Sequence, residues 1–249
     1  MTHNILELSG IQKSFGAVSA SDGIDMNVQS GTVHALIGPN GAGKTTLVNL
    51  ISGELLPDHG TAVFNGEDIT LMKPYLRAQK GLARSYQITS IFEHLSVAEN
   101  MALSILAQSG HNFRFFRNAF SAPLVKANLE SCLDRVGLCD RADIIASHLS
   151  HGEKRQLEVG MTLSGQPKLL VLDEPMAGMG PGGTVEMSKL INKLRQEMTI
   201  LLVEHDMKVV FSLADQITVL VYGKAIAHGT PEEIKAHAEV KTAYLGDNG

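Results

Sequence analysis

Several features that would assign a chain to a class at once are missing from this 249-residue sequence. It has only two cysteines, Cys132 and Cys139, without the paired spacing of a metal site, so reduced thiols are the expectation. No apolar run approaches the roughly 20 residues that a membrane helix needs. The first residues lack the basic start and apolar stretch of a signal peptide. If the protein works at a membrane, we expect other subunits to span it.

An excess of positive charge and internal repeats are missing as well. The formal net charge of −5 gives no indication of nucleic-acid binding, so we expect no nucleic-acid partner. No repeated or low-complexity tract is visible along the chain. What is present is a hydrophobic content of 44%, which predicts a packed globule rather than disorder.

Residues 38–46 form the most informative segment, Gly-Pro-Asn-Gly-Ala-Gly-Lys-Thr-Thr, which fits the pattern G-x-x-x-x-G-K-[ST] of a phosphate loop. Its glycines let backbone N–H groups turn inward around a polyphosphate. Lys44 would reach the β- and γ-phosphates, and Thr45 would offer a hydroxyl to Mg²⁺. We expect a strand, Val33–Ile37, before the loop and a helix, Lys44–Ile51, after it, whose positive dipole end faces the phosphates. A glycine-rich turn with an incidental lysine is the competing interpretation, and the flanking strand and helix weigh against it.

A second apolar run, Leu169–Leu172, ends in two acids, Asp173 and Glu174. Ligands gather at the carboxyl ends of strands in parallel sheets. Asp173 would therefore hold Mg²⁺, directly or through water, and Glu174 would polarise an attacking water. The alternative is a solvated strand end with ordinary surface acids, which the phosphate loop in the same chain disfavours.

The order of the expected elements indicates an α/β core that a group of helices interrupts. Short β-like segments come first, helical segments follow after about residue 88, and strand–helix–strand alternation starts at residue 168. We expect strands at Ile5–Leu8, Ile24–Val28, Val33–Ile37, Thr61–Phe64, Leu169–Leu172, Ile200–Val203 and Ile217–Val221, and helices at Lys44–Ile51, Val97–Ala107, Leu124–Val136 and Lys154–Leu163. The sequence thus predicts one domain over residues 1–249, with a parallel-sheet core at 1–87 and 161–249 and a helical subdomain at 88–160.

The segment Leu-Ser-His-Gly-Glu at residues 149–153, called the signature segment below, has both a structural and a functional interpretation. Ser150 and Glu153 form the S-x-x-E pattern of a capping box. A capped helix start with Gly152 and an exposed serine is also an anion site, so both interpretations can hold together. Placed before an apolar strand that ends in Asp-Glu, this segment resembles the signature of ABC-type ATPases.

The other motifs of that family match in order, and the resemblance gives them roles. It implies that Phe15 stacks on adenine, with Val18 beside it. It implies that Gln87 is the glutamine of a switch loop and that His205 contacts the γ-phosphate. By this resemblance the catalytic residues are Lys44, Gln87, Glu174 and His205, the metal-binding residues are Thr45, Gln87 and Asp173, and the nucleotide-binding residues are Phe15, Val18, Gly38, Asn40, Gly41, Ala42, Gly43, Lys44, Thr45, Thr46, Ser150, Gly152 and Glu153.

The same resemblance implies the fold and the cofactors. The fold would be α/β, a P-loop NTPase (RecA-like) core with a parallel sheet, an N-terminal antiparallel β subdomain and an inserted helical subdomain. The cofactors would be ATP and Mg²⁺.

Three stretches are similar, more narrowly, to the ATP-binding subunits of branched-chain (hydrophobic) amino acid importers. They are residues 81–87 with 95–100, residues 203–210, and residues 222–233 with the ending Ala-Tyr-Leu-Gly at 243–246. Urea and amide importers share these features, and lipopolysaccharide-export ATPases share them less closely. The resemblance implies ATP-driven uptake of branched-chain amino acids or related small polar solutes, at the cytoplasmic, inner face of the cell membrane. The implied partners are integral membrane permease subunits, a second ATPase chain (the same or a paralogue) in a head-to-tail dimer, and indirectly a solute-binding protein.

The sequence departs from the family pattern at a few positions. His151 and Glu153 replace the commoner Gly and Gln of the signature, but Ser150 and Gly152 are kept, so we expect activity. Most members have Asp or Asn where Gly180 stands, a residue that helps to couple two nucleotide sites; the change bears on coupling and not on ATP binding. Phenylalanines at 113, 115, 116 and 120 crowd beside two arginines, which predicts a helix hairpin with stapled aromatics or else a membrane-side contact.

Two other classes of function stay open at this point. A non-transport ABC protein of the chromosome type needs long coiled coils, and the chain has no sustained heptads; one of the translation type usually carries two ATPase modules, and this chain has one. A small-molecule P-loop kinase would have no role for the signature segment or for His205.

Overall fold

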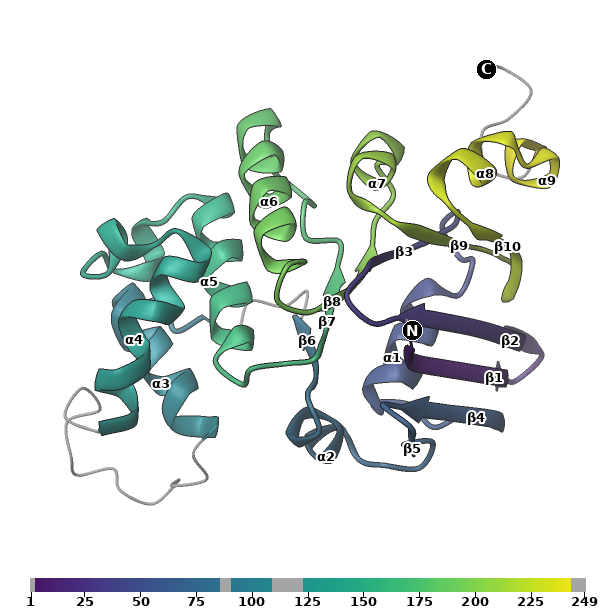
Figure 1. Cartoon of the computed structure of the whole chain (residues 1–249), viewed down its shortest axis with the longest axis horizontal. Coiled ribbons are helices and arrows are strands. Elements are labelled where there is room, and N and C mark those ends of the chain that lie inside the picture. Colours follow the sequence, from purple (N-terminus) through teal and green to yellow (C-terminus); the bar gives the residue numbers. More distant parts are fainter. Residues whose placement is uncertain (1–2, 86–90, 109–122, 243–249) are drawn as a thin grey trace. The chain divides into compact units, whose positions relative to one another are not determined.

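A computed structural model describes residues 3–85, 91–108 and 123–242 of the chain (Figure 1). The chain forms two compact units. The first contains Met1–Arg84, Lys168–Glu174 and Arg195–Gly249, and the second contains Ser85–Pro167 and Pro175–Leu194. In the described ranges, no helix combines the length and the apolar character that crossing a bilayer requires.

The first unit begins with an antiparallel sheet in the strand order β2-β1-β4-β5. Its strands are β1 (Asn4–Phe15), β2 (Val18–Gln29), β4 (His59–Phe64) and β5 (Glu67–Asp68). Along β2 buried and exposed residues alternate towards its end, as expected for a strand with one face on the core. The β1–β2 hairpin turns at Gly16, where φ is +60° and glycine is favoured.

A second sheet holds six strands in the order β10-β9-β3-β8-β7-β6. They are β3 (Val33–Ile37), β6 (Leu82–Ser85), β7 (Leu169–Asp173), β8 (Thr199–Val203), β9 (Gln216–Val221) and β10 (Lys224–Gly229). The four strands β9, β3, β8 and β7 pair in parallel, and β10 pairs antiparallel with β9. Every residue of β3, β7 and β8 is buried, which explains why these segments are nearly continuous apolar runs.

Helices cover both faces of the central strand β3. Leu36 belongs to a core cluster with Leu47 and Ile51 of helix α1 (Lys44–Ser52), and the antiparallel sheet packs on the same cluster. Ala35 and Ile37 point into a second cluster, to which α7 (Met207–Leu213), α8 (Pro231–Ala236) and α9 (Ala238–Val240) contribute. A further short helix, α2 (Pro74–Gln79), follows the antiparallel sheet in the chain. The phosphate loop is therefore anchored at both ends, by a fully buried strand and by a helix that is buried along one side.

The second unit is helical. It contains α3 (Val97–Gln108), α4 (Pro123–Val136), α5 (His151–Leu163) and α6 (Pro181–Leu194), with short 3₁₀ turns at Cys139–Arg141 and Ala146–His148. Helix α5 packs closely on α3 and α4, because a Cβ on Gly160 would lie 2.6 Å from Met101 and 3.0 Å from Val136. This contact explains a glycine in the middle of α5, where it costs helix stability.

All the strands and helices expected from the sequence lie within observed elements. The expected boundaries of the helical subdomain, 88–160, stay a prediction; in the structure α6, from the segment 175–194, belongs to the same compact unit as α3, α4 and α5. The phenylalanine-rich segment at 113–120 lies outside the described residues, as does the ending at 243–246.

Candidate functional site

The phosphate loop follows β3 directly and leads into α1. Lys44, the first residue of α1, is buried, and its Nζ donates hydrogen bonds to the carbonyl oxygens of Gly38 (2.6 Å) and Pro39 (3.1 Å). The ammonium group therefore lies within the turn of the loop. Asn40, Gly41 and Thr45 are exposed, whereas Ala42 is buried.

Two positions of the loop require glycine, because a side chain there would clash with the backbone of neighbouring strands. A Cβ at Gly38 would lie 2.2 Å from the carbonyl oxygen of Leu220 in β9. A Cβ at Gly43 would lie 2.3 Å from the carbonyl oxygen of Ala20 in β2, and its φ of +102° also favours glycine. The β9–β10 turn adds a hydrogen bond from the Gly223 amide to the Ala42 carbonyl at 2.9 Å. The loop is thus held in one shape by the strands on either side of it.

Burial lowers the pKa of Lys44, and the carboxylates of Glu174 and Asp173 raise it in part. Both acids are therefore close enough to influence the Lys44 ammonium group electrostatically. A cation that is partly removed from water interacts more strongly with a phosphate than an exposed cation does.

Asp173 and Glu174 lie where β7 ends. Asp173 is buried, and its Oδ2 accepts a hydrogen bond from Arg84 Nη2 at 2.8 Å. Glu174 has a φ of +46°, in the left-handed region that a non-glycine residue seldom occupies. Its amide is held by the carbonyl of Val203 at the end of β8, at 2.9 Å. Backbone strain of this kind is typical of functional positions, where surrounding structure fixes a side chain in an unusual direction.

His205 follows β8 and lies near Glu174 and the neighbouring Glu204. Its Nδ1 lies 4.0 Å from Glu174 Oε1 and 3.8 Å from Glu204 Oε2. The His205 side chain is 61% exposed, whereas that of Glu204 is 1% exposed and its Oε2 accepts the His205 amide proton at 3.1 Å. The imidazole is therefore accessible while the buried Glu204 holds the backbone next to it.

Phe15 and Val18 form an apolar pair beside the turn of the β1–β2 hairpin. The two residues are cross-strand partners, and 50% of Phe15 and 66% of Val18 is exposed. The Nζ of Lys13 lies 5.9 Å from the centroid of the Phe15 ring. An aromatic residue that the core does not use can stack on a planar ring. Because Ala20, two residues after Val18, touches the phosphate loop, this pair lies at the same end of β2 as the loop.

The oxygen donors in this unit fit Mg²⁺ only together with a phosphate ligand. Across residues 3–85, 91–108 and 123–242, no group of three or more His, Cys, Asp or Glu side chains could hold a metal ion by itself. The hydroxyl of the exposed Thr45 and the carboxylate of Asp173 are hard oxygen donors. Mg²⁺ is commonly bound by one or two such groups plus substrate phosphates and water, so this donor set is the type expected.

The signature segment lies in the second unit, at the start of α5. Ser150 is the N-cap residue: its Oγ accepts the amide proton of Glu153 at 3.3 Å, while its own amide donates to Glu153 Oε2 at 2.8 Å. Glu153 also pairs with Arg141 at 2.9 Å. The hydrogen bond from the Ser150 backbone is the main cause that lowers the pKa of Glu153. The expected capping box is confirmed.

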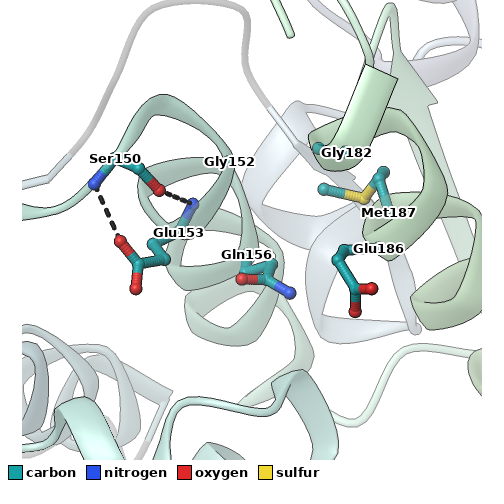
Figure 2. A pocket seen from close by; sticks show the side chains of 8 residues that line it. Ser150, Gly152, Glu153, Gln156, Gly182, Glu186 and Met187 are labelled. Atoms are coloured by element: carbon teal, nitrogen blue, oxygen red, sulfur yellow. Dashed lines mark hydrogen bonds between the residues drawn. The ribbon is translucent and has the colours of Figure 1, made fainter. Parts of the chain in front are cut away.

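A pocket of about 270 Å³ opens beside this helix start (Figure 2). It lies between the N-terminal parts of α5 and α6, and Figure 2 shows Gln156 and Glu186 on these two neighbouring helices. Its lining is Ser150, Gly152, Glu153, Gln156, Gly182, Gly183, Glu186 and Met187. The three glycines leave backbone exposed, so another molecule could approach the helix start closely. Gly180, just before α6, is exposed and a Cβ there would meet nothing within 4 Å.

The structure therefore brings most of the expected site residues together in the first unit. The phosphate loop, the pair Asp173 and Glu174, His205, and the pair Phe15 and Val18 all belong to it, whereas Ser150, Gly152 and Glu153 belong to the second unit. Gln87 lies outside the described residues. Sequence reasoning missed Arg84 as a hydrogen-bond donor to Asp173. The one sequence feature that could have indicated it is an arginine near the end of the short segment before Gln87.

Comparison with known proteins decides the family. The ABC transporter family model matches residues 21–177, which is more than half of the chain. The chain belongs to the ABC transporter family of ATPases. A second model, described as the branched-chain amino acid ATP-binding cassette transporter, matches residues 226–249 of this ABC ATPase.

Curated relatives extend over nearly the whole chain of the ABC ATPase. It is 37% identical to the high-affinity branched-chain amino acid transport ATP-binding protein BraF of Pseudomonas aeruginosa, over 99% of this chain and 100% of the relative. It is 35% identical to the corresponding protein LivG of Escherichia coli, with the same coverage. The lipopolysaccharide export system ATP-binding protein LptB of Haemophilus influenzae is 31% identical, over 98% of each chain.

Solved structures agree with the family. The ADP conformation of MJ1267, an ATP-binding cassette of an ABC transporter, has a TM-score of 0.87 and 31% sequence identity, over 98% of this chain and 100% of that one. The P-loop NTPase fold that the sequence predicted is confirmed, and so are the ABC family and its ATPase activity. The resemblance to the branched-chain amino acid importer group is confirmed as well, and these comparisons disfavour the small-molecule kinase.

Proposed function

We infer that this chain is the ATP-hydrolysing subunit of an importer for branched-chain amino acids, which works at the inner face of the cell membrane with permease subunits. One observation carries the inference. The phosphate loop with Lys44, the acids Asp173 and Glu174, and His205 lie in one unit, where burial lowers the pKa of Lys44 and the two acids raise it in part. The substrate class rests on the match at residues 226–249 and on the relatives named for branched-chain amino acid transport.

In this proposal the first unit binds one face of the nucleotide. Lys44 and the backbone amides of residues 38–46, including those of Asn40, Ala42 and Thr46, surround the phosphates. Phe15 and Val18 offer the exposed apolar surface on which adenine stacks. Preorganised donors of this kind stabilise the charge that develops on the transferred phosphoryl group.

Thr45 and Asp173 would hold Mg²⁺ together with the phosphates, and Gln87 would complete the ligands from the switch loop. When bound, Mg²⁺ neutralises charge on the phosphate oxygens. Glu174, held in a strained backbone conformation, orients the attacking water and accepts its proton. His205 stays exposed 4.0 Å from Glu174, where it can contact the γ-phosphate.

The signature segment serves the nucleotide of a second ATPase chain in this proposal. The Oγ of Ser150 accepts the Glu153 amide proton, so its own hydroxyl proton can be donated to a phosphate oxygen. The pocket at Ser150 and Gly152 gives a partner chain access to this helix start. Two chains, identical or paralogous, would therefore bind two nucleotides head to tail.

Residues 91–100 form a surface that could contact a permease subunit. The side chain of the buried Asn100 accepts the Phe92 amide at 2.8 Å and donates to the carbonyls of Phe92 (3.1 Å) and Ser96 (3.0 Å). These bonds fix the segment while leaving 55% of Phe92 exposed. We propose that a cytoplasmic helix of the permease packs against Phe92.

The permease surface can be tested with a matched pair of variants. Phe92→Asp should abolish transport and spare basal ATPase activity. Leu124→Asp changes an exposed apolar residue of α4 in the same unit and should leave transport intact. Normal transport by Phe92→Asp would place the permease contact elsewhere.

Uptake in cells tests the function itself. A strain without this gene would be complemented with the wild type or with Lys44→Ala, and uptake of labelled leucine, isoleucine and valine compared with uptake of urea and acetamide. We expect only the wild type to restore uptake of the branched-chain amino acids, and the wild-type chain to co-purify with integral membrane proteins from detergent extracts. If the wild type restored uptake of urea alone, the proposed substrate class would be wrong. If it restored uptake of none of these solutes, the importer role would be refuted.

A further inference from the structure

Arg84 is a buried cation that directly contacts the acid expected to bind the metal. It lies in β6, the strand next to β7 in the six-stranded sheet. Its Nη2 donates to Asp173 Oδ2 at 2.8 Å, and the two side chains are only 8% and 6% exposed. A charge-assisted hydrogen bond between two groups that are this well shielded from water is strong and directional.

The other terminal nitrogen of Arg84 binds the far end of the phosphate-loop helix. Nη1 donates to Asn49 Oδ1 at 2.6 Å and lies 3.4 Å from Ser52 Oγ, both on α1. It also pairs with Glu54 Oε2 at 3.2 Å, just after that helix. One planar guanidinium thus joins Asp173 to the helix that begins with Lys44.

Arg84 could affect a metal ion at Asp173 in two ways, by repelling it through its charge or by orienting the carboxylate. A lone arginine beside Asp173 would weaken the attraction of the carboxylate for a cation. Here Glu54 shares the positive charge of Arg84, so the field of the guanidinium at Asp173 is partly cancelled. Arg84 also has a geometric effect, because a bond to one carboxylate oxygen restrains the plane of the group.

We propose that Arg84 is a positioning residue, which holds the Asp173 carboxylate in the orientation that a nucleotide-bound divalent cation requires. The proposal rests on the proposed function, since it needs a nucleotide with Mg²⁺ at this site. It goes further by giving a role to Arg84, a residue to which the sequence motifs assigned none. Side chains that hydrogen-bond to the ligands of a metal ion orient those ligands and contribute strongly to the affinity for the metal.

The test separates binding of Mg²⁺ from binding of nucleotide. A fluorescent ATP analogue would be titrated onto the purified full-length chain in EDTA, and then Mg²⁺ would be titrated at a fixed nucleotide concentration. For Arg84→Met we expect the Mg²⁺ concentration at half-maximal effect to rise about 10- to 100-fold, the loss typical when a hydrogen-bond partner of a metal ligand is removed. Affinity for the analogue in EDTA should stay within about twofold, because Lys44 and the loop are unchanged.

Three further variants keep the proposal falsifiable. Arg84→Lys keeps the charge but cannot span both partners, so its Mg²⁺ requirement should rise to an intermediate value. Asn49→Ala removes one anchor of the guanidinium and should produce a smaller rise. Arg195→Met removes another arginine–carboxylate pair of the first unit, with Asp215, and should leave the Mg²⁺ requirement unchanged.

The outcomes are distinct. A lower Mg²⁺ requirement in Arg84→Met would mean that Arg84 competes with the cation for Asp173, and an unchanged requirement would mean that it only supports the fold; either result overturns the proposal. If Arg84→Met does not fold, wild-type values in both Arg84→Lys and Asn49→Ala would overturn it. A wild-type chain that binds no nucleotide with or without Mg²⁺ would instead refute the proposed function.

Discussion

Removal of the guanidinium of Arg77 should destabilise the first unit more than any exposed substitution. Arg77 is 1% exposed, and burial lowers its pKa to about 10, so that it is still protonated at neutral pH. It donates to four backbone carbonyls: Leu50 (2.6 Å), Ile51 (2.8 Å), Met72 (2.9 Å) and Thr70 (3.0 Å). The first two belong to the last turn of α1, where a positive charge also interacts favourably with the helix dipole.

The expected magnitude follows from these contacts. Arg77→Met keeps most of the apolar volume but leaves the four carbonyls without this donor. At a net value of about 1 kcal/mol for each bond, the loss is about 4 kcal/mol. For a chain of this size that corresponds to a fall of about 8 to 16 °C in the unfolding temperature.

Thermal and urea unfolding would measure the loss. The control is Lys80→Met, which removes an exposed ion pair with Glu67 from the same region and should cost less than about 1 kcal/mol. Because Arg77 binds the opposite end of α1 from Lys44, folded Arg77→Met should bind nucleotide within about twofold of wild type. An Arg77→Met variant as stable as Lys80→Met would refute the role assigned to the buried guanidinium.

Three further predictions concern the site and its surroundings. Lys44→Ala should weaken ATP binding severely because it removes the buried ammonium from the loop, and unchanged binding in equilibrium dialysis would contradict the assignment. Gly180→Asp should fold with an unfolding temperature equal to or slightly above that of wild type, because a Cβ there meets nothing and an acid favours the start of α6; a clear fall in calorimetry would show a hidden constraint. The pKa of Glu153 is lowered in the fold, so its stabilising effect is present at neutral pH and is lost as the pH falls below the ordinary value of 4.5. Urea unfolding at several pH values should show that Glu153→Gln is less stable than wild type between pH 5 and 7 and that the difference shrinks once the pH falls below 4.5; a difference that stays constant below pH 4.5 would argue against the ionised capping box.

Local patterns predicted the elements that hold the site, for physical reasons. The segments that became β3, β7 and β8 are buried on both faces, so their apolar runs identify them without any tertiary knowledge. The phosphate loop and the capping box of α5 follow from residue types at fixed spacing, because backbone geometry imposes those requirements locally.

Contacts across the sheet could not be predicted in the same way. Arg84 meets Asp173 because the strand order brings β6 beside β7, and the sequence around Arg84 does not contain that order. Arg77 is an arginine in a short helix whose other residues are exposed, where an exposed side chain is the usual expectation, yet it is buried against the end of α1. Phe15 is the opposite case, since an isolated phenylalanine is more often part of the core and here is half exposed.

Hydrolysis of ATP at a site completed by a second chain is tested most directly with Glu174→Gln. This change keeps the shape of the side chain but removes the charge that orients and deprotonates water, so phosphate release should fall by about 10²- to 10⁴-fold while MgATP still binds. Size-exclusion chromatography with and without MgATP should then show an ATP-dependent dimer of the variant. In the wild type, hydrolysis would make this dimer dissociate. Phosphate release at the wild-type rate would remove Glu174 from the mechanism. A variant that stays monomeric with ATP bound, both alone and when mixed with a paralogous ATPase chain, would contradict the shared site.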